Sequence, residues 1–421
     1  MPGSSLSLLF AAALLASLLV KLWLATRQMR HVAAHRGAVP AAFAGAVSLQ
    51  AHQKAADYTL AKGRFSLLTM AFGTAVVLGW TLLGGLDALN AAVRDYAMPR
   101  WGGMVYQLAL LGAFAFVSGL LDLPFELYGT FRLEQRFGFN RMTLGLWFQD
   151  LLKGVAVTIV LGLPLAAAVL WIMGAAGGLW WLWAWAVLTG YQLLMMVIVP
   201  LWVMPLFNKF EPLADESLRE RVQALMQRCG FAAKGLFVMD GSLRSAHSNA
   251  YFTGLGRSKR VVFYDTLLQQ LSPSEVEAVL AHELGHFKHK HVMKRMVGMF
   301  LFSLAALALL GWLSNQAWFY TGLGVKPNLE APNDALALLL FMLVVPVFGY
   351  FVSPLLAQLS RKHEFEADAF ACAQASARDL ANALLKLHED NAGTLTPDPL
   401  YVRFYYSHPP ATERLAALQA P

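Results

Sequence analysis

Seven stretches of this chain are long and apolar enough to cross a lipid bilayer, and they limit the possible folds more than any other feature. A membrane-spanning helix needs about 20 predominantly apolar residues. Helices of this kind satisfy all their backbone hydrogen bonds inside lipid. We therefore predict a mainly α, polytopic membrane protein with seven transmembrane helices. The stretches cover residues 6–25, 65–86, 104–121, 155–173, 179–204, 296–312 and 335–359.

The composition supports a membrane protein and argues against a series of soluble domains. The chain is 57% hydrophobic and 14% charged, whereas soluble chains carry about 25% charged residues. The net charge of +7 does not indicate nucleic-acid binding, because the basic residues gather in loops on one side of the membrane. Cys229 and Cys372 have no CxxC spacing. They predict neither a disulfide framework nor a cysteine metal site.

The distribution of basic residues predicts the orientation of the spans. The first loop holds six basic residues between Arg27 and Arg64, and the third and fifth loops are basic as well. The second loop carries only Arg94 and Arg100, and the sixth only Lys326. Because cytoplasmic loops are the basic ones, we expect the N-terminus outside and the fifth loop and C-terminus in the cytoplasm.

The fifth loop contains the motif HELGH at residues 282–286. Four residues turn a helix by about 400°, so His282 and His286 lie on one face, as two ligands of one metal ion must. Glu283 lies beside that face, where it can take a proton from an attacking water molecule. The motif predicts a zinc metallohydrolase, and specifically a protease, with one zinc ion per chain.

A second acidic motif supplies the missing metal ligand. Glu364 follows His286 by 78 residues, and Asp368 lies four residues further on. Two spans separate Glu364 from His286, so both reach the same side of the membrane. We predict Glu364 as the third zinc ligand, which leaves one coordination position for water. Asp368 is then expected to accept a hydrogen bond from a ligating histidine and so orient its ring.

Three further polar residues near these motifs are expected to be solvated. Glu366 lies about 200° around its helix from Glu364 and should point away from the metal. His289 and His291 stand among lysines at the membrane edge, so exposure to solvent is favoured over metal binding.

The sequence between the fifth and sixth spans predicts a small soluble insert. Apolar residues at helical spacing predict a helix over 216–230. A short strand is expected at 236–239, and a hairpin at 249–252 and 260–264 around a turn at Gly254 and Gly256. Ser272 and Glu275 form a capping box that starts the HELGH helix. Val276, Leu280, Leu284 and Phe287 are expected to face a core on that helix. Pro346 and Pro354 should bend the helix that precedes Glu364.

Several motifs in the same order resemble those of the type 1 CAAX prenyl proteases, the seven-span membrane zinc metalloproteases. The resemblance extends over nearly the whole chain. The motifs are MDGS at 239–242, HSNAYFTG at 247–254, HELGH at 282–286, SRKHEFEADAF at 360–370, SHPP at 407–410 and ERL at 413–415.

The resemblance implies a fold in which seven helices enclose a water-filled intramembrane chamber. A gluzincin-like insert with a small β-hairpin or sheet, together with C-terminal helices, would cap it. It also implies zinc bound by His282, His286 and Glu364, with Glu283 as general base. The activity that it implies is endoproteolysis beside a prenylated cysteine.

The same resemblance implies roles for three residues outside the metal motifs. Asn249, on an expected edge strand, would help to hold an extended substrate by strand addition. His408 and Arg414 would stabilise the oxyanion or orient the ligands. The expected partners are a peptide or protein substrate and the lipid bilayer, with no nucleic acid.

We expect four parts along the chain. Residues 1–205 form helices one to five with their loops, and 206–295 form the catalytic insert. Residues 296–360 form helices six and seven, and 361–421 form cytoplasmic helices that carry the third ligand. The Ala- and Leu-rich sequence favours a bacterial inner membrane, with the endoplasmic reticulum membrane expected for a eukaryotic chain.

Two alternative functions stay open. One is a quality-control metalloprotease for membrane proteins, although seven spans favour the prenyl-protease type. The other is a zinc-stabilised transporter or lipid-binding scaffold without catalysis. Glu283 argues against a scaffold, which needs metal ligands but no general base.

Overall fold

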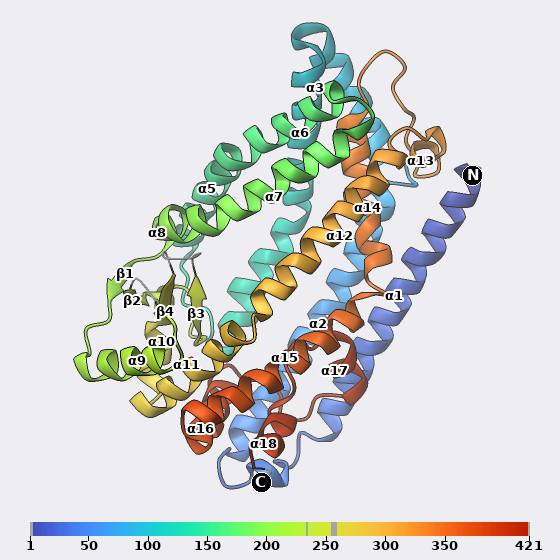
Figure 1. Cartoon of the computed structure of the whole chain (residues 1–421). Coiled ribbons are helices and arrows are strands. Elements are labelled where there is room, and N and C mark those ends of the chain that lie inside the picture. Colours follow the sequence, from blue (N-terminus) through green and yellow to red (C-terminus); the bar gives the residue numbers. More distant parts are fainter. Residues whose placement is uncertain (1–2, 233–234, 254–258, 420–421) are drawn as a thin grey trace.

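Long helices that run side by side dominate the computed structural model, which describes residues 3–232, 235–253 and 259–419 (Figure 1). Within these described residues, six helical stretches are long and apolar enough to cross a membrane, and a bent helix pair gives a seventh when it is taken as one span. The predicted seven-span, mainly helical architecture is therefore confirmed. The long helices are α1 (Gly3–Ala34), α2 (Leu49–Trp80), α3 (Gly85–Tyr128), α5 (Leu144–Val157) with α6 (Leu163–Ala175), α7 (Trp180–Ile198) with α8 (Met204–Phe207), α12 (His291–Leu313) and α14 (Asp334–Gly349) with α15 (Ser353–Gln374).

The seventh span is broken between α14 and α15, which meet at an angle of 66°. Pro346 lies inside α14, and Pro354 lies in the first turn of α15. A proline inside a helix removes a backbone hydrogen bond and clashes with the preceding turn. The predicted bend is confirmed, and it sends α15 towards the soluble insert, where α15 packs on α11 (Pro273–Lys288).

A buried apolar core joins the helices inside the membrane, and includes Phe10, Leu86, Leu110 and Leu170. Other large apolar side chains are exposed, such as Leu8, Phe116 and Trp202. An exposed apolar surface around long helices suits contact with lipid, because the bilayer interior is apolar.

The soluble insert contains a four-stranded sheet with the strand order β1-β2-β4-β3. β3 and β4 pair antiparallel, which confirms the predicted hairpin, although its turn at Gly254 and Gly256 lies outside the described residues. The sequence reading missed β1 and the parallel pairing of β2 with β4. The strands are β1 (Phe210–Pro212), β2 (Gly235–Met239), β3 (Ala250–Thr253) and β4 (Arg260–Tyr264).

Helices complete the insert and position the HELGH motif. In α9 (Glu216–Arg228), the predicted apolar face, including Val222 and Leu225, is buried. The short α10 (Asp265–Gln270) leads into α11, which begins at the predicted capping box. Glu275 Oε2 accepts a hydrogen bond from the Ser272 backbone N–H at 2.7 Å. The expectation for Phe287 was only partly met: its side chain, at the end of α11, is 40% exposed, although its ring packs edge-on against the buried Phe231.

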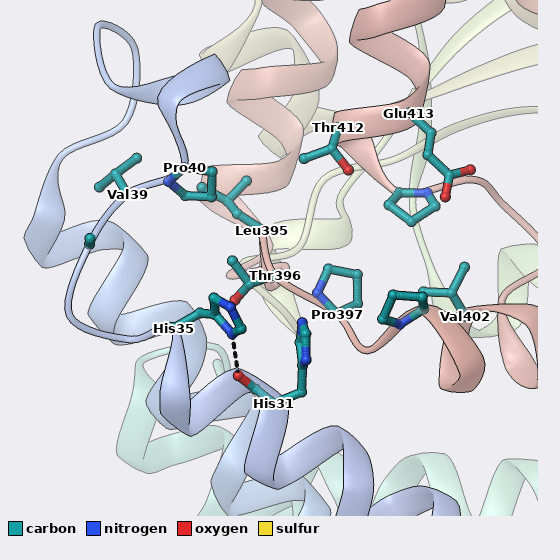
Figure 2. A pocket seen from close by; sticks show the side chains of 13 residues that line it. His31, His35, Val39, Pro40, Leu395, Thr396, Pro397, Val402, Thr412 and Glu413 are labelled. Carbon is teal, nitrogen blue, oxygen red and sulfur yellow. Dashed lines mark hydrogen bonds between the residues drawn. The ribbon is translucent and has the colours of Figure 1, made fainter.

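The C-terminal helices are α16 (Ala377–Asp390), α17 (Pro399–Tyr405) and α18 (Ala411–Gln419). They pack beside α15 and against the ends of α1 and α2 that flank the first loop (Figure 1). Arg27 Nε of α1 donates to Asp398 Oδ2 at 2.8 Å. Next to this ion pair, a pocket of about 470 Å³ opens between the first loop and the C-terminal segment, with His31, His35 and Pro397 in its wall (Figure 2). None of the predicted metal ligands lines this pocket.

Candidate active site

The close approach of α11 and α15 brings the two metal motifs together. Gly285 lies where the helices meet, and a Cβ atom on it would stand 2.9 Å from Ala367 Cα. Only glycine leaves room for backbones this close. His282 and His286 on α11 consequently face Glu364 on α15.

The three predicted ligands form a compact group. His282 Nε2 lies 3.4 Å from Glu364 Oε2. His286 Nε2 lies 3.3 Å from Glu364 Oε1 and 3.3 Å from His282 Nε2. The side chains of His282 and Glu364 are buried, and that of His286 is mostly so. Each helix therefore presents its ligand atoms to one small space.

The spacing of these atoms fits a zinc ion. Tetrahedral zinc with ligand bonds of about 2.0–2.1 Å separates its ligand atoms by about 3.3–3.4 Å. Moreover, Glu364 Oε2 is buried without a hydrogen-bond partner among the described residues. A buried carboxylate oxygen is costly to leave unpaired, so this atom has the environment of a metal ligand.

The electrostatics of the site also favour a cation. Burial lowers the pKa of His282, but the neighbouring carboxylates of Asp368 and Glu364 more than offset this and raise it to about 9. The two carboxylates thus stabilise positive charge at this point. Burial raises the pKa of Glu283, partly offset by the nearby histidines. A raised pKa moves a carboxylate towards the range in which it exchanges protons near neutral pH.

Asp368 contacts the Nδ1 side of the His282 ring, and Arg414 pairs with Asp368. Asp368 Oδ1 lies 2.8 Å from His282 Nδ1. Arg414 Nε donates to Asp368 Oδ2 at 2.8 Å, and Arg414 Nη1 lies 3.8 Å from Glu364 Oε2. Both side chains are buried. Arg414 therefore balances the charge of Asp368 and contacts the ligand group directly.

His408 and Asn249 are both exposed, but only His408 lies next to the ligand group. His408 Nε2 stands 3.5 Å from Glu364 Oε1, while 66% of its side chain is exposed. It is thus placed where a substrate could meet it. Asn249 is exposed and directly precedes β3, the last strand in the sheet order of the described residues. No contact joins Asn249 to the metal ligands among the described residues, so its link to the site is through β3.

The expectation of a solvated side chain was wrong for His291. For Glu366 it was only partly right, because this side chain also pairs with His291. His291 is only 4% exposed. Its Nδ1 lies 3.1 Å from His286 Nδ1, and its Nε2 lies 2.8 Å from Glu366 Oε2. His289 is exposed, as expected. No sequence signal indicated this contact of His291. In one continuous helix, a residue five positions after His286 would lie on another face.

Comparisons with known proteins cover the whole length of this fold. The model described as "CAAX prenyl protease N-terminal, five membrane helices" matches residues 28–209, and that of "Peptidase family M48" matches residues 212–421. The chain belongs to the CAAX prenyl protease 1 group of peptidase family M48.

Individual relatives agree with this assignment. The CAAX prenyl protease 1 homolog of Arabidopsis thaliana is 36% identical over 386 residues, with 90% of each chain covered. CAAX prenyl protease 1 of Saccharomyces cerevisiae is 33% identical, with 87% of this chain and 85% of the relative covered. The crystal structure of S. mikatae Ste24p is 31% identical, covers 100% of both chains and superposes with a TM-score of 0.92.

These findings establish an integral membrane zinc metalloprotease that acts on peptide or protein substrates. Its fold is that of a membrane protease with an internal chamber. The predicted family resemblance and enzyme class are confirmed. The quality-control and scaffold alternatives are not favoured.

Proposed function

We propose that this metallopeptidase holds one zinc ion through His282, His286 and Glu364, with Glu283 as its general base. The observation that carries the proposal is the buried Glu364 Oε2, which has no hydrogen-bond partner among the described residues and lies 3.4 Å from His282 Nε2. Two imidazoles and one carboxylate are a donor set that catalytic zinc uses, with one position left open.

The chemistry follows from what surrounds the ligands. A bound zinc ion supplies polarisation of a water molecule and of the scissile carbonyl. Glu283 takes a proton from the water as its oxygen bonds to the carbonyl carbon, and then gives that proton to the amine nitrogen as the C–N bond breaks. Asp368 holds the His282 ring in the tautomer whose Nε2 is free to bind metal.

His408 and Arg414 complete the proposed site. The exposed His408 ring, 3.5 Å from Glu364 Oε1, is placed to donate a hydrogen bond to the negative oxygen that develops on the substrate. Arg414 is buried against Asp368, so its proposed part is to orient the ligands. We infer that Asn249 positions a substrate strand along the free edge of β3.

We propose peptides with a prenylated cysteine as substrates. Relatives that cover most of the chain are named CAAX prenyl proteases. An isoprenoid is apolar and suits a space walled by transmembrane helices, while the adjoining peptide can extend along β3. On this proposal the lipid and the peptide occupy separate surfaces.

We further propose an orientation with the catalytic insert and the C-terminus in the cytoplasm, in a bacterial inner membrane or, in a eukaryote, the endoplasmic reticulum membrane. The basic loops support it. We also propose the division into parts 1–205, 206–295, 296–360 and 361–421, which follows the order of the spans and the insert. The two parts that carry the metal motifs meet through α11 and α15.

A matched pair of peptides tests the substrate proposal. Purified protein in detergent is given one CAAX-type peptide in two forms, with a farnesylated and with a free cysteine, and the products are identified by mass spectrometry. We expect cleavage beside the farnesylated cysteine at a kcat/KM at least tenfold above that of the free form. Equal cleavage of both forms would favour quality-control proteolysis. Glu283→Gln serves as the inactive control for contaminating proteases.

A further inference from the structure

A second cluster of metal-binding side chains lies next to the catalytic ligands. His291, His363 and Glu366 each offer a ligand atom, and these atoms lie within 4.8 Å of one another. His291 Nε2 is 2.8 Å from Glu366 Oε2. The rings of His291 and His363 stack with centroids 4.0 Å apart. The cluster shares no residue with the group formed by His282, His286 and Glu364.

A reversal of the chain explains how His291 reaches this place. α11 ends at Lys288, and Lys290 adopts a left-handed conformation with φ of 57°. α12 then begins at His291, which the reversal directs back towards α15. A left-handed conformation is uncommon for a residue with a Cβ. On α15, His363 and Glu366 are three residues apart and therefore neighbours on one face.

We propose that His291, His363 and Glu366 form a second metal site that binds a divalent cation of the Zn²⁺ type. Two imidazole nitrogens and a carboxylate oxygen are ligands that zinc accepts. The side chain of His291 is 5% exposed and that of Glu366 is 33% exposed. One buried ligand thus fixes the site, and a partly exposed one opens it to solvent.

The contacts also predict that this site binds more weakly than the catalytic one. Ligand atoms up to 4.8 Å apart must approach to about 3.3–3.4 Å around tetrahedral zinc. The half-buried His363 ring must turn out of its stack to allow this. Lys362 Nζ lies 3.9 Å from Glu366 Oε1, and its positive charge competes with a cation.

The hydrogen bonds that link His286, His291 and Glu366 must also break when the second cation binds. When His286 uses Nε2 as a ligand, its Nδ1–H donates to His291 Nδ1, 3.1 Å away. His291 then carries its proton on Nε2 and donates to Glu366. A cation on His291 Nε2 moves that proton to Nδ1, where it faces the N–H of His286. Zinc at the first site therefore weakens the second site, which should fill at a higher zinc concentration.

Metal titration tests the proposal independently of proteolysis. Detergent-purified protein is dialysed against increasing Zn²⁺, and bound zinc is measured by elemental analysis. We expect one tightly bound equivalent and a second equivalent at higher concentration. In His363→Ala and Glu366→Gln, the second equivalent should bind at least tenfold more weakly while the first remains. Loss of the first equivalent in Glu364→Ala reports on the proposed catalytic site, so the two proposals fail separately.

His289→Ala is the matched control. This exposed imidazole stacks on His291 with centroids 5.5 Å apart, but it is not one of the three ligands. Its removal should leave both equivalents bound. The proposal is overturned if the wild-type protein binds only one equivalent. It is also overturned if His289→Ala loses the second equivalent as fully as His363→Ala does, since a general histidine-rich surface would then be the binding element.

Discussion

Asp368 Oδ1 lies 2.8 Å from Nδ1 of His282, on the opposite side of the imidazole from the Nε2 atom that faces Glu364. This contact assigns the ring proton to Nδ1 and leaves Nε2 free for metal. Such outer partners fix both the tautomer and the orientation of a ligating histidine. Arg414 in turn pairs with Asp368 inside the protein. In the proposed site, the second acidic motif therefore supplies one ligand, Glu364, and one helical turn later the residue that orients another ligand, His282.

Replacement of Asp368 by asparagine should weaken the site without abolishing it. Asn keeps an oxygen that can accept from His282, but it loses the charge that balances Arg414. We expect kcat/KM or zinc affinity to fall about 10–100-fold. Peptide cleavage and zinc content measure the two effects. Complete loss of zinc, equal to that in Glu364→Ala, would show that Asp368 is itself a ligand.

Alanine at Gly285 should separate the two motif-bearing helices. Its Cβ would lie 2.9 Å from Ala367 Cα and 3.0 Å from the Ala367 carbonyl oxygen. Overpacking of this kind costs about 1–3 kcal/mol, and a shift of α15 moves Glu364 away from the histidines. We expect lower thermal stability together with a loss of bound zinc.

A glycine on α12 provides the control for this substitution. A Cβ on Gly298 meets nothing within 4 Å, so Gly298→Ala should leave stability and zinc content close to wild type. Equal effects of Gly285→Ala and Gly298→Ala would contradict the close contact between α11 and α15.

Loss of the capping box should destabilise the helix that carries HELGH. Ser272 Oγ accepts a hydrogen bond from the Glu275 backbone N–H at 3.4 Å. Removal of a serine at this position typically costs about 0.5–2 kcal/mol. Ser272→Ala should therefore lower the thermal unfolding temperature measured in detergent. An unchanged unfolding temperature would mean that tertiary contacts alone hold the start of α11.

Cysteine labelling in intact cells tests the orientation. Single cysteines are placed at Ala92, Leu329 and Ala417, in a background with Cys229 and Cys372 replaced. All three positions are exposed in the structure, and Leu329 is 98% exposed. Because the basic loops are expected inside, a membrane-impermeant maleimide should label positions 92 and 329 but not 417. The reverse pattern would place both metal motifs on the outer side.

The sequence predicted those parts of the site that depend on local periodicity. HELGH fixes two histidines on one helical face, and the capping box marks where that helix begins. Glu364 could be predicted as the third ligand from chemistry and from the even number of spans between it and His286, and the structure places it beside the two histidines. Pro346 and Pro354 likewise indicated the bend that the structure shows between α14 and α15.

Features that depend on contacts between distant segments could not be predicted in this way. The parallel pairing of β2 with β4 joins residues that are separated by a hairpin strand. The burial of His291 depends on the left-handed backbone conformation of Lys290, which no local sequence pattern predicts. Phe287 was expected in the core because its spacing continued the helix, but α11 ends one residue later.

The paired assay of zinc content and peptide cleavage in Glu283→Gln tests the central claim most directly. Glutamine matches the shape of Glu283 but cannot accept a proton from water, and it removes no metal ligand. We predict about one tightly bound zinc ion per chain, as in the wild-type protein, with cleavage of the farnesylated peptide lowered by at least 1000-fold. Wild-type cleavage by this variant, or loss of the tightly bound zinc, would contradict the assignment of Glu283 as the general base of this site.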